Sequence, residues 1–227
     1  AFDPSGPTFR DEAFADYKAQ REKTPEDIKL SVPIIKQILE AMNIPILEVK
    51  GYEADDVIGT LATQASHFDI ETYMLTPDKD YGQLVKDNVF IYRPRHGGGY
   101  EILGVEQIKE KYQIESPSQV IDILALMGDS ADNFPGCPGV GEKTAIKLIN
   151  DFKSINNLLE NTNQLKGKLK EKVEGAVDDI KMSNFLATIK TDVPIELNLT
   201  DLQLTPPNEE KLRALFDELE RSEEHTS

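Results

Sequence analysis

The sequence predicts an α/β domain followed by an all-helical one. Short apolar segments typical of strands, at residues 71–75, 89–92 and 100–103, alternate with segments of helical periodicity in the first half of the chain. The strand pattern ends near Val105, and helical segments dominate beyond it. We therefore place a domain boundary near residues 115–117, which gives one domain over residues 1–115 and a second over residues 116–220.

The elements of the first domain follow from local patterns. Residues 9–21 mix aromatic and basic side chains and predict a short helix that ends before Pro25. Apolar residues recur with the helical period over residues 30–42 and again over residues 54–66. Residues 46–49 between them predict a further short strand, and the glycine-rich residues 93–99 predict a hairpin loop.

The second domain is expected to consist of helices at residues 120–127, 142–151, 155–159 and 165–186. An amphipathic helix at residues 209–220 follows, and a polar run at residues 221–227 then breaks its pattern. We interpret that run as a non-native tail that is set aside in the reasoning about the fold, the alternative being a natural disordered linker.

Composition excludes some classes of protein. The chain has 227 residues and no apolar run near the roughly 20 residues that a membrane-spanning helix needs. A single cysteine, Cys137, excludes an intrachain disulfide and is typical of a reducing cytoplasm. The net charge of −16 disfavours a simple nucleic-acid binder, so any DNA binding must come from local basic patches.

Acidic residues gather in four short motifs, each where a strand ends or a helix begins. Within them, Glu53 and Asp56 are spaced i and i+3 and so share one side of a helix, while Asp78 and Asp80 are spaced i and i+2. Oxygen ligands without cysteine or histidine favour Mg²⁺ or Mn²⁺ over Zn²⁺. The candidate metal ligands are Asp3, Glu53, Asp55, Asp56, Asp78, Asp80, Asp129 and Asp132.

Each acidic motif also has a purely structural interpretation. Acids in the first turn of a helix are stabilised by its dipole, which would explain residues 53–56. Residues 78–80 could form a solvated turn, and residues 128–133 could form an Asx-rich loop. The four motifs together favour a metal site, because each adjoins an apolar segment that would draw its acids inward.

Two further segments have the composition of nucleic-acid contacts. Paired glycines and a lysine between two helices predict a helix-hairpin-helix that grips a phosphate backbone, the alternative being an ordinary helix connection. Its candidate contacts are Gly139, Val140, Gly141, Lys143 and Thr144. The interleaved Arg10, Tyr17, Lys18 and Arg21 could hold a single strand by charge and base stacking, or could form a charged helix face.

These motifs occur in an order that resembles the 5′-nuclease domain of bacterial DNA polymerase I over residues 1–220. The resemblance implies a PIN-like (resolvase-like) nuclease core with a mostly parallel sheet, followed by an all-α helix-hairpin-helix subdomain. The matching stretches are Phe2-Asp3, Thr8-Phe9-Arg10, Tyr17-Lys18-Ala-Gln-Arg21, Gly51-Tyr-Glu-Ala-Asp-Asp56, Thr76-Pro-Asp-Lys-Asp80, Gly128-Asp-Ser-Ala-Asp-Asn-Phe-Pro-Gly136 and Gly139-Val-Gly-Glu-Lys-Thr144.

The resemblance implies a structure-specific 5′-3′ exonuclease or flap endonuclease. The eight acids would bind two Mg²⁺ or Mn²⁺ ions, one of which activates a water for in-line hydrolysis of a phosphodiester. Lys18 and Arg21 would be catalytic residues in an arch over the scissile phosphate, and K⁺ would bind at the hairpin. The substrates would be 5′ flaps, nicks and RNA primers. The native protein would be monomeric, fused to a downstream polymerase domain, and associated with the bacterial nucleoid in the cytoplasm.

The sequence departs from the family at its start. The family begins with a strand that ends in another metal-binding Asp, followed by an arginine-bearing helix. We therefore expect an N-terminally truncated piece with an incomplete site, which cuts 5′ flaps poorly or not at all. Two other classes stay open. A non-catalytic DNA-junction binder is favoured if metal binding is absent, and a PIN-like RNase is favoured if cleavage needs no duplex junction.

Overall fold

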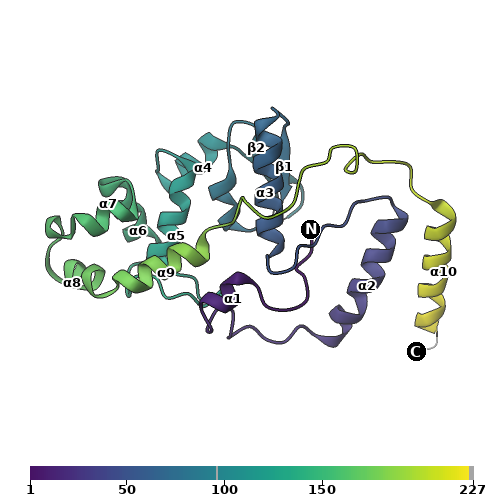
Figure 1. The fold of residues 1–227 in the computed structure, drawn as a ribbon, viewed down its shortest axis with the longest axis horizontal. Coiled ribbons are helices and arrows are strands. Elements are labelled where there is room, and N and C mark those ends of the chain that lie inside the picture. The colour runs from purple at the N-terminus through teal and green to yellow at the C-terminus, as the bar shows by residue number, and fades with distance from the viewer. Residues whose placement is uncertain (96, 225–227) are drawn as a thin grey trace.

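The computed structural model of the chain describes residues 1–95 and 97–224, with side chains to residue 220. Figure 1 shows an elongated molecule with the sheet near its middle, α6 to α9 at one end and α2 with α10 at the other. The predicted tail at residues 221–227 lies partly outside the described residues, because 225–227 are not among them. Residues 221–224 continue the last helix, so the prediction that this helix breaks after residue 220 is wrong.

The sheet has three strands in the order β1 (Thr72–Leu75), β2 (Val89–Pro94) and β3 (Tyr100–Leu103). The strands lie where the sequence predicts them and confirm the α/β class. β1 pairs with β2 in parallel, and β2 pairs with β3 in antiparallel fashion through the predicted hairpin. Among the described strands the sheet is therefore mixed rather than mostly parallel, because the short hairpin loop forces its second strand to run back.

The strand predicted at residues 46–49 does not form. The backbone there is irregular, and its one backbone hydrogen bond to a distant segment joins Phe2 N to Leu47 O at 3.0 Å. A strand needs a ladder of such bonds to a neighbour, and local apolar character does not supply one. The prediction is wrong for that reason.

Four helices belong to the first half: α1 (Phe9–Ala13), α2 (Glu26–Ala41), α3 (Ala54–His67) and α4 (Val105–Tyr112). The 3₁₀ helix η1 (Lys79–Leu84) follows β1. The helix predicted over residues 9–21 ends early, because Phe14 is extended and Lys18 has a positive φ of 54°. The segment between α1 and α2 is thus a series of turns, which carries Tyr17, Lys18 and Arg21.

The second half is helical, as predicted. Its helices are α5 (Val120–Met127), α6 (Glu142–Phe152), α7 (Ile155–Glu160), α8 (Gly167–Gly175), α9 (Val177–Ala187) and α10 (Glu209–Glu224), with 3₁₀ turns η2 (Pro117–Gln119) and η3 (Thr162–Gln164). The single helix predicted over residues 165–186 is two helices, because the chain leaves helical geometry at Ala176, directly after Gly175. Glycine lowers helix stability and favours a break there.

Helix α5 is the centre of the packing. Val120, Ile123 and Leu124 are almost completely buried, and α5 contacts α6, α9 and η1. Most of the buried hydrophobic side chains form one cluster that extends from Tyr17 to Ile189. The two predicted domains therefore share a core, and the boundary at residues 115–117 stays a prediction.

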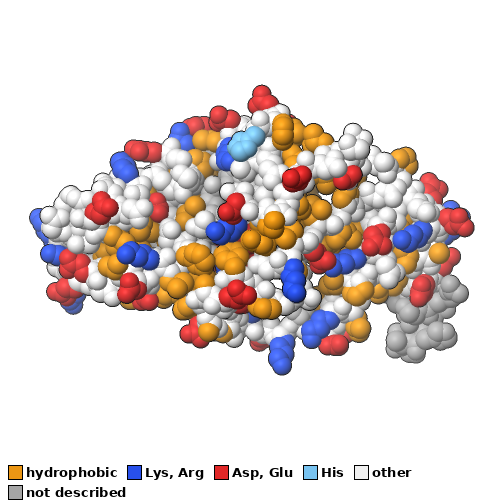
Figure 2. All heavy atoms as spheres, viewed as in Figure 1, with side chains coloured by type: hydrophobic (Ala, Val, Ile, Leu, Met, Phe, Trp, Pro, Cys, Tyr) orange, Lys and Arg blue, Asp and Glu red, His pale blue; other side chains and the backbone are white. Residues whose placement is uncertain are grey.

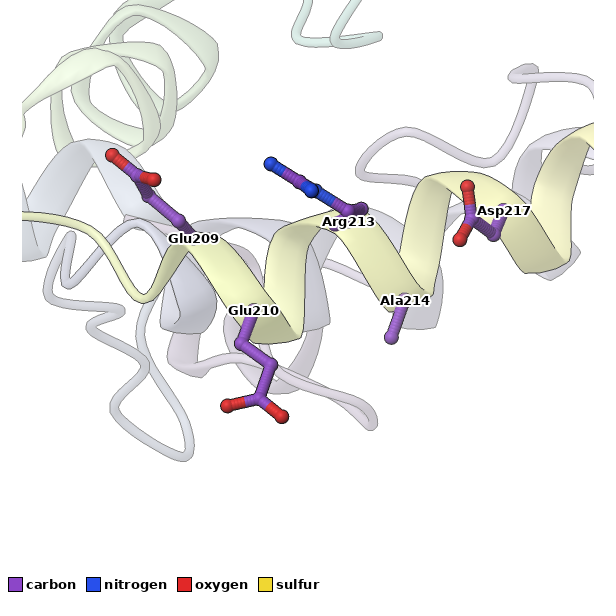
Figure 3. Close-up of a pocket in the computed structure, with 5 residues that line it drawn as sticks. All are labelled: Glu209, Glu210, Arg213, Ala214 and Asp217. Carbon is purple, nitrogen blue, oxygen red and sulfur yellow. The ribbon is translucent and has the colours of Figure 1, made fainter.

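Helices α2 and α10 pair with each other at one end of the molecule (Figure 1). Asn208 N donates to Ala41 O at 2.7 Å, and Lys211 lies 3.7 Å from Glu40. A depression along α10 is lined by Glu209, Glu210, Arg213, Ala214 and Asp217. Figure 3 shows their side chains pointing in different directions, so they do not converge on a ligand. No helix in the described ranges is long and apolar enough to cross a membrane.

We expect Leu124→Ala to lower the free energy of unfolding by about 2–5 kcal/mol, because loss of a buried side chain leaves a cavity. Urea unfolding followed by circular dichroism measures this change. Both halves should unfold in one shifted transition, since they share the cluster around α5. Leu204→Ala is the control, at a side chain that is 78% exposed. Two separate transitions, only one of which moves, would contradict the shared core.

Candidate active site

The predicted acids reach one region from four segments. Glu53, at the N-cap of α3, and Asp55, in its first turn, face the loop that follows β1, which carries Asp78 and Asp80. Asp129 and Asp132 come from the loop after α5. Asp3 is tied to the same place, because its Oδ1 accepts a 2.7 Å hydrogen bond from the backbone of Ala54.

Two buried tyrosines connect these segments. The Tyr17 hydroxyl lies 3.2 Å from Glu53 Oε2 and 3.4 Å from Asp132 Oδ2, and so bridges acids that are far apart in the sequence. The Tyr81 hydroxyl donates to Asp55 Oδ1 at 2.6 Å. Sequence reasoning missed Tyr81, although its place directly after the Asp78–Asp80 motif is a usable signal.

Asp80 is the acid in the least favourable surroundings. Its Oδ1 is buried and has no hydrogen-bond partner among the described residues. Burial raises the pKa of Asp80 to about 7, and the nearby charges of Asp78, Asp129 and Asp132 add to the shift. A buried oxygen without a partner is costly. A cation beside Asp80 would satisfy this oxygen and relieve the repulsion, so the residues present fit a divalent metal.

Asp55 has a related environment. Burial raises its pKa, the Tyr81 hydrogen bond opposes that shift, and the charges of Asp78 and Glu53 reinforce it. These acids are therefore close enough to raise one another's pKa by charge repulsion. They are nevertheless not gathered into a ready coordination shell, because no group of three or more Asp, Glu, His or Cys side chains in the described part of the chain could hold a metal ion.

Basic side chains of the protein lie between the acids instead. Lys18 Nζ is 2.5 Å from Glu53 Oε1, and Arg21 forms an ion pair with Asp132. Lys79 Nζ is 2.7 Å from Asp129 Oδ2. Burial of the Lys79 ammonium lowers its pKa, but the hydrogen bond and charge of Asp129 outweigh burial and raise it. The predicted arch residues Lys18 and Arg21 thus lie at the site.

Asp56 lies in a structural ion pair, and its predicted role as a metal ligand stays a prediction. Its side chain is fully buried, and both of its oxygens are engaged. Oδ1 accepts from Arg10 Nη2 and Lys190 N, each at 2.8 Å. Oδ2 accepts from Arg10 Nη1 at 2.7 Å and from Glu53 N at 3.0 Å.

Arg10 and Tyr17 lie inside the protein, and their predicted contacts with DNA stay predictions. Arg10 is 2% exposed, and its guanidinium also donates to the carbonyls of Leu186 and Thr188 at 2.9 and 2.7 Å. Tyr17 is 5% exposed, so its ring is not available to stack on a base. Both side chains hold the site together from within.

The predicted hairpin follows the Asp129 loop directly. Gly139 has a φ of +72°, which favours glycine, and Gly141 caps α6. Val140 is buried and donates its N–H to Cys137 O at 3.0 Å. The side chain and the amide of Val140 are therefore both engaged within the protein, and its predicted contact with DNA stays a prediction. Lys143 is exposed, and Thr144 is half-buried in the first turn of α6.

Comparisons with known proteins identify the family of the chain. Residues 1–113 match the family described as 5′-3′ exonuclease, N-terminal resolvase-like domain. Residues 115–210 match 5′-3′ exonuclease, C-terminal SAM fold. The chain belongs to the 5′-3′ exonuclease family. The predicted fold, a resolvase-like core followed by a helical domain, is confirmed for this family member.

Curated relatives of this exonuclease chain are longer proteins. It is 45% identical to DNA polymerase I of Bacillus subtilis (strain 168) over 221 residues, which are 96% of this chain and 25% of that protein. It is 41% identical to the thermostable DNA polymerase I of Thermus aquaticus over 219 residues, with 96% and 26% covered. The chain thus spans about a quarter of the length of these relatives.

Solved structures share the exonuclease fold. T5 D15 protein, co-crystallised with metal ions, superposes with a TM-score of 0.71 at 19% identity, covering 95% of this chain and 83% of that one. The catalytic core of Rad2 in complex with DNA substrate gives a TM-score of 0.61 at 17% identity, with 95% and 71% covered. At such identities the likeness shows the fold alone.

We expect Arg10→Met to destabilise the protein by about 3–5 kcal/mol, because it leaves the buried Asp56 carboxylate unpaired. Thermal and urea unfolding measure the change. The control is Arg95→Met, since Arg95 is exposed and lies 3.5 Å from Glu101. Its effect should stay within about 1 kcal/mol. Equal effects of the two substitutions would show that the Arg10 cluster is not a structural requirement.

We also expect the stability of the metal-free protein to fall with rising pH. The pKa of Asp80 is raised from 3.8 to about 7, so the folded state favours its protonated form. That contribution is present below pH 4 and is lost as the pH rises to about 7. At pH 8 in EDTA, Asp80→Asn should therefore be more stable than wild type by about 1–3 kcal/mol. The difference should shrink at pH 5, and the exposed-site control Asp87→Asn should show neither effect.

Proposed function

We propose that this chain is a divalent-metal-dependent nuclease that hydrolyses DNA at 5′ flaps, nicks and RNA primers, as a 5′-3′ exonuclease and flap endonuclease. One observation carries the proposal most directly. Carboxylates from separate segments surround the buried, unpartnered Asp80 Oδ1, with the basic side chains of Lys18 and Arg21 at the same place. Membership of the 5′-3′ exonuclease family supports it.

We assign two Mg²⁺ or Mn²⁺ ions to the predicted acids Asp3, Glu53, Asp55, Asp78, Asp80, Asp129 and Asp132. Of these, Glu53, Asp129 and Asp132 pair with basic side chains that a cation has to displace. Asp56, the eighth predicted acid, is held by Arg10. Such ions neutralise charge on a phosphate and lower the pKa of a water. Lys18 and Arg21 then orient the phosphate by charge and hydrogen bonding. Because positioning and electrostatics supply the catalysis, no covalent nucleophile is required.

The hairpin is suited to hold the duplex beside the cut. The Asp129 loop is closed by paired backbone hydrogen bonds with Phe134 of 3.1 and 3.0 Å, and the hairpin begins only a few residues later. The first N–H groups of α6 lack partners within the helix and suit a phosphate. Lys143 adds positive charge, and we propose K⁺ at the hairpin turn of residues 139–141. Two acids of the proposed metal site and the proposed DNA-binding hairpin thus lie on one loop between α5 and α6.

Charge limits how DNA binds. Figure 2 shows Lys and Arg dispersed among acidic and apolar side chains on the visible face, with no continuous basic patch there. With a net charge of −16, binding must rely on a few local cations. We propose that recognition therefore depends on the junction shape, with the arch residues and the hairpin engaged together.

The relatives of the chain suggest the cellular process in which it acts. They are bacterial DNA polymerases of about four times this length, so we propose that the activity serves replication and repair in the bacterial cytoplasm, with a polymerase domain downstream. A second candidate is DNA-junction binding without cleavage. It is favoured by one observation, that basic side chains rather than a ready carboxylate shell fill the described site.

We expect the native protein to release short 5′-phosphorylated products from a labelled 5′-flap duplex in a Mg²⁺-dependent reaction that EDTA abolishes. Asp132→Asn should reduce cleavage by at least about 100-fold, because it misplaces a cation near the phosphate. Asp87→Asn, outside the site, should cut like wild type. Tight flap binding without any cleavage would favour the second candidate, and equal affinity for flap and plain duplex would contradict junction recognition.

A further inference from the structure

Lys79 is the residue between the two acids of the loop after β1. Its ammonium donates to Asp129 Oδ2 at 2.7 Å. The other oxygen, Oδ1, accepts from the backbone of Ala131 at 2.7 Å and of Asp132 at 3.3 Å. Both oxygens of Asp129 are therefore engaged, and a cation can reach Oδ2 only when the ammonium leaves.

The ammonium has room to leave. The Lys79 side chain is 39% exposed, whereas that of Asp129 is 13% exposed, so the pair lies at the border between the site and solvent. A depression of about 420 Å³ adjoins it, with Lys79, Met127, Ser130 and Pro135 among its lining residues. Rotation of the lysine side chain into this space breaks no core contact of η1, because its buried residues are 81–84.

Lys79 differs from the two arch residues that also pair with acids. Lys18 and Arg21 come from the turns between α1 and α2, a segment separate from the loop of Asp78 and Asp80. Lys79 instead starts η1, where the Asp78 side chain accepts from Asp80 N at 2.9 Å across it. Its charge therefore belongs to the same short loop as two of the candidate ligands.

We propose that Lys79 is a built-in competitor for divalent cations at Asp129. Its ammonium neutralises Asp129 while no metal is bound, and a metal ion must displace it to use that carboxylate. This inference rests on the proposed function, because it assumes that Asp129 is a metal ligand. Lys79 is thus a positioning residue that stabilises the metal-free site at the expense of affinity for one of the two ions.

The test is a Mn²⁺ titration of the full chain by calorimetry, with bound ions counted by electron paramagnetic resonance. Lys79→Met should bind one of the ions about tenfold more tightly than wild type, since a competing charge is removed from a half-buried carboxylate. Lys79→Arg keeps the charge and should bind like wild type. Lys109→Met removes a lysine paired with Glu106 on an exposed helix and should also bind like wild type.

The stability of the metal-free proteins gives a second readout, in which Lys79→Met should be less stable than wild type although it binds Mn²⁺ more tightly. In EDTA, Lys79→Met should unfold at a lower temperature than wild type, because Asp129 loses its counter-charge. A merely structural lysine would lower both stability and metal affinity when removed. If Lys79→Met does not fold, Lys79→Gln keeps a hydrogen-bond donor without the charge and allows the same comparison.

The outcomes separate the two proposals. Unchanged or weaker Mn²⁺ binding by Lys79→Met, with wild type binding two ions, overturns the competitor role and leaves the proposed nuclease intact. Absence of Mn²⁺ binding by wild type overturns both. Tighter binding by Lys79→Met and Lys79→Arg alike would also overturn it, because the charge would then be irrelevant.

Discussion

The buried ion pair of Arg10 and Asp56 is the interaction on which the rest of the site depends. Asp56 binds the N-cap amide of Glu53 and the amide of Lys190, while Arg10 binds the carbonyls of Leu186 and Thr188. One charged pair therefore connects the start of α3 to the end of α9 and to the residues that follow it. A buried pair offsets its desolvation only when its hydrogen bonds are all made, so this geometry is held from several directions at once. Glu53 and Asp55 reach the site from that fixed end.

The second constraint is the repulsion among the acids that the fold brings together. Basic side chains of the same chain offset this repulsion. Lys18, Arg21 and Lys79 each pair with an acid of the site. Backbone geometry fixes the rest. A Cβ on Gly136 would lie 2.3 Å from Gly128 N, so only glycine allows the two arms of the Asp129 loop to approach. The same close approach places the hairpin of residues 139–141 next to the acids of the Asp129 loop.

The sequence predicted those helices and strands whose positions are set by local residue patterns. The bounds of α5 and β3 match the periodicity in the sequence, because an apolar face is visible in the residues themselves. The strand at residues 46–49 failed because pairing depends on a partner that no local pattern contains. For Asp56 the sequence left two interpretations open. Its i, i+3 spacing with Glu53 is the same for a metal ligand and for a capping box, and only the structure shows the capping box and the buried Arg10 beside it.

The pairing of acids with basic side chains also bears on how an acidic protein could hold DNA. In the described structure Lys18 and Arg21 form ion pairs with Glu53 and Asp132. These pairs neutralise their charges and leave little positive potential for a phosphate. If divalent ions take those carboxylates, as the proposed function requires, the same two side chains are released where the scissile phosphate must lie. Metal binding then converts a self-neutralised site into a basic one without any change in sequence charge. The net charge of −16 and a DNA substrate are compatible for this reason.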